Sequence, residues 1–145
     1  MQWLLKSLFL VAVLIAGNES FHAGRGDEKA PTVSVCDILR NPSNYVHKTL
    51  TVTARITSTK EGAYIWSPDC SKRVITLHFA TKSGLGIADL YRELDKYGLG
   101  DHPVIATLTG VYVRDYYDDI RHVHYPVFSA IAATDVRRSR NVERQ

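Results

Sequence analysis

Apolar and polar residues alternate most regularly over residues 49–56 of the chain. Leu, Val, Ala and Ile occupy every second position there, and Thr or Arg fills the others, which predicts a strand with one buried and one exposed face. Similar patterns between turn residues predict four more strands, over residues 63–67, 73–80, 104–114 and 127–136. In the fourth strand of the chain the apolar phase changes at Gly110, so we expect a β-bulge there.

Two other stretches have the spacing of helices. Over residues 87–97 the apolar positions recur at intervals of three or four, which places them on one helical face. Asp89 near the start of this stretch and Lys96 near its end suit the helix dipole. A shorter helix is expected after Ser34, because Ser34 and Asp37 have the spacing of a capping box.

In sequence order these elements are a short helix, three strands, a longer helix and two strands. Three strands, a helix and two strands is the order of the OB-fold, a five-stranded Greek-key barrel. We therefore predict an all-β domain with added helices over residues 32–136, an OB-fold-like barrel with a helix between its strands 3 and 4 and a short N-terminal helix. Residues 24–31 are rich in glycine and charge and are predicted to be a flexible lead-in.

The first 23 residues have the pattern of a secretory signal peptide. Lys6 precedes an unbroken apolar run over residues 7–17, and small residues follow it. That run is too short to cross a bilayer, which takes about 20 apolar residues in a helix. A buried N-terminal helix is the alternative. We predict export, to the periplasm or as a secreted protein, with no stable membrane anchor after the signal is removed.

The chain has two cysteines, Cys36 and Cys70. An even number in a small exported protein is explained most simply by a disulfide between them, and buried free thiols are the alternative. The chain-entropy relation gives a loop of this size a stabilisation of about 3–4 kcal/mol. We therefore expect the disulfide to contribute a large share of the stability of so small a domain.

The composition fits a single globular domain. The chain has 145 residues, of which 45% are hydrophobic and 23% charged, and its formal net charge is +3. Up to residue 136 the 14 Lys+Arg and 14 Asp+Glu cancel, so all of the net charge lies in a predicted basic tail, residues 137–145. We interpret this tail as a solvated end, with contact to an anionic partner as the alternative.

Residues 36–56 resemble the opening of small exported bacterial OB-fold-like proteins of unknown function. That opening is a short helix, an Asn-Pro-x-x-Tyr turn, a lysine and a Thr/Val-rich first strand, here Asn41, Pro42, Tyr45, Lys48 and residues 49–56. The Pro-Asp-Cys of residues 68–70 is also similar to that group, whereas His47 and Ala54 stand where the group usually has glycine. The resemblance implies export and an OB-fold, and it brings no catalytic or ligand-binding residues.

Tyr64 and Trp66 are the first candidates for ligand binding. They share a phase on the second predicted strand, near Lys60, Lys72 and Arg73. OB-folds bind single-stranded nucleic acid by stacking bases on such aromatic residues within a basic groove. A nucleic-acid-binding domain would concentrate basic residues on one surface, whereas the body of this domain has no net charge. The alternative is that Trp66 fills the barrel.

The second candidate is the segment over residues 115–125, which is rich in Asp, Tyr and His. Its candidate ligand-binding residues are Tyr116, Tyr117, His122 and His124. The two histidines are two positions apart, so on an extended chain they point the same way, as two ligands of a transition metal would. Such a site needs a third or fourth ligand, and a solvated hairpin connection is the plainer interpretation.

The sequence contains no Gly-x-Ser-x-Gly, no His-Glu-x-x-His and no phosphate-binding glycine loop. We therefore expect a non-catalytic binding module that uses no cofactor and takes a protein or cell-envelope ligand. A single-stranded nucleic-acid-binding OB domain is the second interpretation. A metal-binding protein that uses His122 and His124 is the third.

Overall fold

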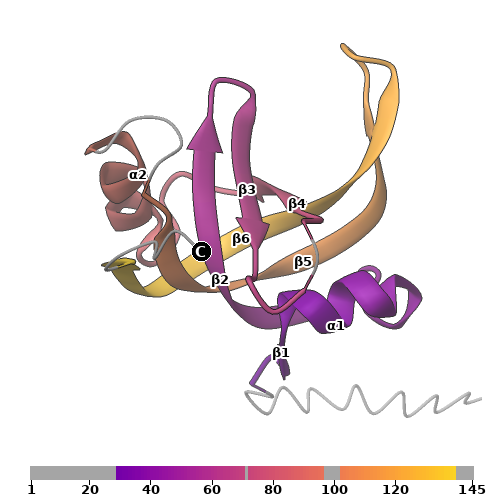
Figure 1. The fold of residues 1–145 in the computed structure, drawn as a ribbon, viewed down its shortest axis with the longest axis horizontal. Coiled ribbons are helices and arrows are strands. Elements are labelled where there is room, and N and C mark those ends of the chain that lie inside the picture. The colour runs from indigo at the N-terminus through magenta and orange to yellow at the C-terminus, as the bar shows by residue number, and fades with distance from the viewer. Residues whose placement is uncertain (1–28, 71, 97–101, 140–145) are drawn as a thin grey trace, which may run out of the picture.

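The computed structural model describes residues 29–70, 72–96 and 102–139 of the chain. These residues form six strands, two α-helices and one 3-10 helix, and all six strands belong to one mixed sheet (Figure 1). The prediction of an all-β domain with added helices is therefore confirmed. The predicted signal peptide lies outside the described residues.

Strand pairing closes the sheet into a ring. β2 (Thr49–Thr59) pairs antiparallel with β3 (Gly62–Trp66) along its second half and with β5 (Val104–Asp118) along its first half. β3 pairs with β4 (Ile75–Phe79), β4 runs parallel to β6 (Val123–Arg138), and β6 pairs with β5. The ring is therefore β2–β3–β4–β6–β5 and back to β2.

Apolar side chains fill the inside of this ring. Alternate residues of β2 point inward, as the sequence pattern predicts, and all four of them are buried: Leu50, Val52, Ala54 and Ile56. α2 (Ile87–Lys96) packs against β6 and β5 and adds three buried residues from one face: Ile87, Leu90 and Leu94. Because these side chains already fill the interior, large side chains on the outside of the ring are not needed for the core.

The N-terminal helix α1 (Val35–Arg40) forms at the predicted capping box. Ser34 Oγ accepts a hydrogen bond from the Asp37 amide at 3.0 Å, and the Asp37 carboxylate accepts one from the Ser34 amide at 3.4 Å. The 3-10 helix η1 (Pro42–Asn44) follows it. Before α1, β1 (Thr32–Val33) runs parallel to β2, and a strand of two residues is too short for its pattern to be recognised.

Cys36 and Cys70 form a disulfide, as predicted. The bond joins α1 to the loop between β3 and β4, across a sequence separation of 34 residues. Arg73 strengthens the same connection, because its guanidinium donates a hydrogen bond to the Leu39 carbonyl at 2.9 Å. Disulfides persist in oxidising compartments, so the bond indicates a non-cytoplasmic environment. Neither α-helix in the described ranges is long and apolar enough to cross a membrane.

The last two strands are longer than the sequence pattern predicts. β5 continues to Asp118 and β6 begins at Val123, so the segment predicted as a hairpin connection is a β-hairpin arm that extends beyond the ring (Figure 1). Cross-strand pairs of aromatic and histidine side chains supply the pairing surface that a solvated loop would lack. β6 also continues through Arg138, so the first residues of the predicted basic tail belong to the sheet.

The irregularity predicted at Gly110 is present, but its cause differs from the prediction. β6 has one extra residue, Ile131, opposite this point, and the register of the β5–β6 pair shifts there. The burial phase of β5 does not change, since Gly110 and Tyr112 continue the buried positions while Val111 is only half-buried. The predicted phase change is therefore wrong, because a glycine and a tyrosine take inward positions where the pattern favoured valine.

Candidate functional site

The side chains of Tyr64 and Trp66 lie on the outside of the ring. Ile65 between them is fully buried, and successive side chains of a strand point to opposite faces. Trp66 therefore does not fill the interior. Its indole N–H donates a hydrogen bond to Thr57 Oγ1 at 2.9 Å, and the Arg55 guanidinium lies 5.5 Å from the ring centre.

These two aromatic side chains line a groove with a volume of about 400 Å³. The other residues that line it are Thr57 and Thr59 from β2, and Lys72, Arg73 and Val74 from the loop before β4. Of the three basic residues predicted near the two aromatic ones, Lys72 and Arg73 line the groove and Lys60 does not. Apolar walls with a few hydroxyl and charged groups are typical of pockets that bind ligands.

Tyr116 of the arm lies in an aromatic cluster with His78 of β4. The centres of these two rings are 4.9 Å apart at an interplanar angle of 88°, an edge-to-face arrangement. Tyr125 completes the cluster, with its ring centre 5.7 Å from that of Tyr116 and 6.3 Å from that of His78. The arm is therefore held against β4 by aromatic contacts.

The groove and this cluster lie on neighbouring strands. Tyr64 pairs directly with Thr76, and His78 is two residues further along β4, on the same face. We call the combined surface the outer aromatic face; its residues are Tyr64, Trp66, His78, Tyr116 and Tyr125. In the view of Figure 1 the β2–β3 hairpin and the β5–β6 arm extend in the same direction.

The remaining predicted residues lie on the opposite face of the arm. The Tyr117 hydroxyl is 3.0 Å from His122 Nδ1, and the ring centres of Tyr117 and His124 are 4.9 Å apart. A register shift between Val113 and Tyr116 places an extra residue in β5 just before the two tyrosines. Within the described ranges, no group of three or more His, Cys, Asp or Glu side chains could hold a metal ion.

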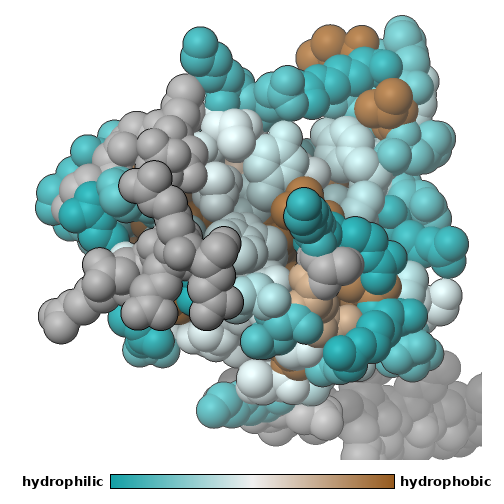
Figure 2. Space-filling view, in the orientation of Figure 1, coloured by the Kyte–Doolittle hydropathy of each residue, from teal (hydrophilic) through white to brown (hydrophobic). Residues whose placement is uncertain are grey.

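Asp118 organises the turn at the tip of the arm. Its carboxylate accepts hydrogen bonds from the amides of Ile120 at 2.9 Å and Arg121 at 3.0 Å, and from the Tyr125 hydroxyl at 3.1 Å. The hydrogen bond from the Arg121 amide contributes most to lowering the pKa of Asp118. The turn leaves Ile120 91% exposed, and Figure 2 shows brown hydrophobic residues among teal hydrophilic ones in this region.

Replacing Asp118 with alanine is expected to loosen the turn without unfolding the ring. The variant loses all three hydrogen bonds, so amide hydrogen exchange at residues 119–122 should speed up about tenfold or more. Because the pKa of Asp118 is lowered from 3.8, the same bonds hold the turn above that value and are lost as the pH falls through the lowered pKa.

Asp119 is the matched control for this prediction, because none of the described residues pairs with its exposed carboxylate. Asp119→Ala is expected to leave the exchange rates of the turn unchanged. Equal rates in the two variants, measured by NMR at neutral pH, would show that Asp118 does not hold the turn.

No protein-family model, curated protein or solved structure matches the chain. The outer aromatic face is therefore assigned from the geometry of this chain alone. Sequence patterns predicted Tyr64, Trp66 and Tyr116 of the outer aromatic face, but they missed His78 and Tyr125 as partners of Tyr116. The sequence could have indicated His78, because it follows the buried Leu77 on the strand and so points to the outer face.

Proposed function

We propose that this protein is an exported, non-enzymatic binding module with an OB-fold, which holds a protein or cell-envelope ligand on its outer aromatic face. The observation that carries the proposal is the groove beside Tyr64 and Trp66. Two large aromatic side chains are held there outside a core that other residues already fill. Partly exposed aromatic residues of this kind are the ones that most often dominate binding energy.

The strand pairing supports the OB-fold part of the proposal. Counted from β2, the ring joins strands in the order 1–2–3–5–4–1, with a helix between strands 3 and 4. OB-folds bind ligands on the face of strands 2 and 3 and on the loops after strands 1 and 4. Those positions correspond here to β3, β4, the β2–β3 turn and the arm, and the outer aromatic face lies on β3, β4 and the arm.

The disulfide and the pattern of the first 23 residues support export, to the periplasm or as a secreted protein. The resemblance of residues 36–56 to small exported bacterial OB-fold-like proteins agrees with this proposal. The aromatic side chains of the outer aromatic face can hold a ligand by stacking and hydrogen bonding. This chemistry favours a binding role over catalysis.

Single-stranded nucleic acid is the second candidate ligand. Lys72 and Arg73 line the groove with Trp66, and Arg55 lies against the Trp66 ring. OB-folds that bind single strands combine aromatic and basic residues in this way. Against it, Arg55 already occupies one face of the Trp66 ring, and Asp69 lies in the same loop as the two cations. A base would therefore have to displace Arg55 or use only the other face.

Trp66→Ala tests the proposal with the exported protein and a cell-envelope fraction from the source organism. We expect the variant to lose at least tenfold in affinity for the envelope ligand. The variant should still fold, because Trp66 is only half-buried and lies outside the buried core. The matched control is Leu85→Ala, which removes a 75% exposed apolar side chain that does not line the groove.

Two outcomes would overturn this assignment. Equal envelope binding by wild type and Trp66→Ala would exclude the outer aromatic face as the binding surface. Tighter binding of an oligothymidine than of any envelope component, with an affinity that falls steeply with salt, would favour the nucleic-acid function instead.

A further inference from the structure

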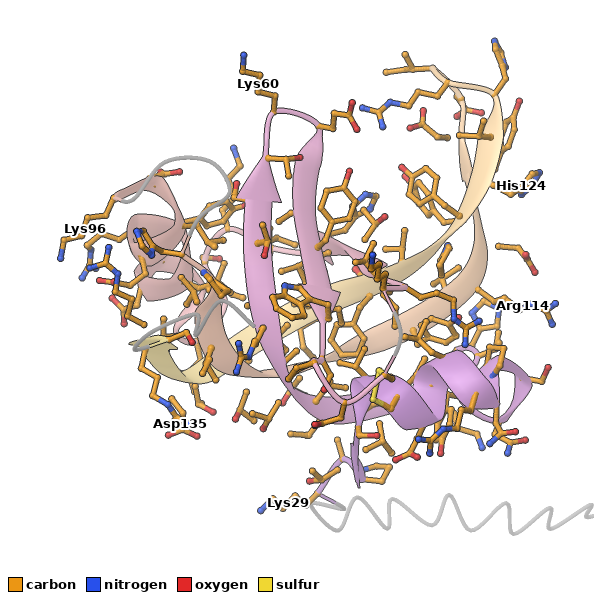
Figure 3. All side chains as sticks on the ribbon, in the orientation of Figure 1. Lys29, Lys60, Lys96, Arg114, His124 and Asp135 are labelled. Atoms are coloured by element: carbon orange, nitrogen blue, oxygen red, sulfur yellow. A yellow bond between two sulfur atoms is a disulfide. The ribbon has the colours of Figure 1, made fainter. Side chains whose placement is uncertain are left out.

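A second and larger groove lies between α1 and the base of the arm. Its volume is about 550 Å³. Leu39 and Pro42 line it from the helical side, Tyr112 and Arg114 from β5, and Pro126 from β6. In Figure 3, Arg114 and His124 lie on the same side of the β5–β6 pair, with α1 below them.

Tyr112 is one of the residues that line this groove. The residue is only 2% exposed, and the structure shows no hydrogen bond from its hydroxyl to any described group. Trp66 and Tyr125, in contrast, both donate to side-chain partners. No fully buried side-chain nitrogen or oxygen of the described residues lacks a hydrogen-bond partner. The Tyr112 hydroxyl is therefore not an unsatisfied buried group, and Tyr112 contacts the groove as one of its lining residues.

Positive charge surrounds the same opening. Lys72, Arg73 and Arg114 line the groove, whereas Asp115 is the one carboxylate among its described lining residues. Arg114 Nε is 3.7 Å from the Asp115 carboxylate, and one terminal nitrogen of Arg114 is 3.4 Å from Ser43 Oγ. An arginine has five N–H donors, so this guanidinium can still bind a further acceptor.

The hydroxyl of Tyr112 is a donor at neutral pH. Burial raises the pKa of Tyr112, and it outweighs the lowering by the nearby Arg114 and Arg73 guanidinium groups. The protonated phenol of Tyr112 and the guanidinium groups of Arg114 and Arg73 line the same opening, so O–H and N–H donors are available to a ligand there. Such a set of donors is complementary to an anionic oxygen group.

We propose that this groove binds a carboxylate or phosphate group carried on an apolar body, with the Tyr112 hydroxyl and the Arg114 guanidinium as its donors. Leu39, Pro42 and Pro126 provide the apolar surface for the body of the ligand. Neither donor belongs to the outer aromatic face, so this site does not rest on the proposed function.

The test is a titration of the full chain, in its disulfide-bonded form, with phenyl phosphate, phenylacetate and the uncharged benzyl alcohol. We expect saturable binding of at least one acidic probe and at least tenfold weaker binding of benzyl alcohol. Preference for phenyl phosphate or for phenylacetate would identify the source of the oxyanion. Tyr112→Phe should weaken binding of the preferred acid about tenfold, and Arg114→Gln at least as much.

Stability separates a binding role of Tyr112 from a structural one. Because Tyr112→Phe removes a hydroxyl without a described partner and keeps the ring, the melting temperature should stay the same or rise. Tyr91→Phe is the matched control: Tyr91 is a half-buried tyrosine on α2, outside this groove, and its variant should bind the acid normally. The site would be refuted by the absence of saturable acid binding, by equal binding of benzyl alcohol, or by unchanged acid binding in Tyr112→Phe. Trp66→Ala should bind the acid like wild type.

Discussion

Replacing Cys36 and Cys70 with alanine together is expected to lower the free energy of unfolding by about 3–4 kcal/mol. The disulfide closes a sequence separation of 34 residues, so its loss allows the unfolded chain many more conformations. A domain of this size has a total stability of about 5–15 kcal/mol, so the loss is a large fraction of it. Urea unfolding followed by circular dichroism measures the change.

Reduction of the wild-type protein provides the control for this experiment. A reductant should destabilise wild type by a similar amount and leave the double variant unaffected. The bond also holds the loop that carries Lys72, Arg73 and Val74, which line both grooves. Ligand binding at both grooves should therefore weaken in the double variant even where it remains folded. Unfolding that neither reductant nor substitution changes would contradict this role of the disulfide.

Gly110→Ala is expected to destabilise the protein by about 3 kcal/mol. A Cβ atom at this position would lie 2.8 Å from Ala130 Cα and 2.8 Å from Phe128 Cε1, and closer still to the Ser129 carbonyl oxygen. Real Cβ atoms do not approach backbone this closely, so β5 and β6 would have to move apart where they form the ring. Chemical denaturation of the purified variant measures the effect.

Thr109→Ala is the control from the same strand. Thr109 faces outward, and its hydroxyl makes only a long 3.4 Å hydrogen bond with the Thr51 hydroxyl. Its loss should cost less than about 1 kcal/mol. If Gly110→Ala costs no more than Thr109→Ala, the close approach of β6 to Gly110 is not important for stability.

The sequence predicts β2, α1 and α2 of this fold. One face of β2 packs on the interior of the ring and the other faces solvent. Apolar and polar residues therefore alternate along it, and this alternation predicts the strand. The capping box of α1 and the apolar face of α2 are likewise patterns of residues close together in sequence, so they predict these helices. The residues that specify each of these elements all lie within that element or next to it in sequence.

Long-range pairing accounts for what the sequence pattern missed. Residues 115–125 resemble a loop because their tyrosines, histidines and aspartates are polar, yet cross-strand partners make them an arm. Tyr112 did not stand out as a site residue, since nothing near it in sequence indicates that α1 and the loop at Arg73 line one groove with it. His78 becomes significant only through Tyr116, which is 38 residues away in the chain.

The indole N–H of Trp66 tests the outer aromatic face most directly. Of the two tryptophans in the sequence, Trp3 lies in the predicted signal peptide, so the protein without that peptide should show a single indole N–H resonance. On titration with the cell-envelope ligand we predict that this resonance shifts and that its hydrogen bond to Thr57 is perturbed, together with the amides of Tyr64 and His78. Saturable ligand binding that shifts neither the indole resonance nor these amide resonances would show that the ligand does not bind on the outer aromatic face.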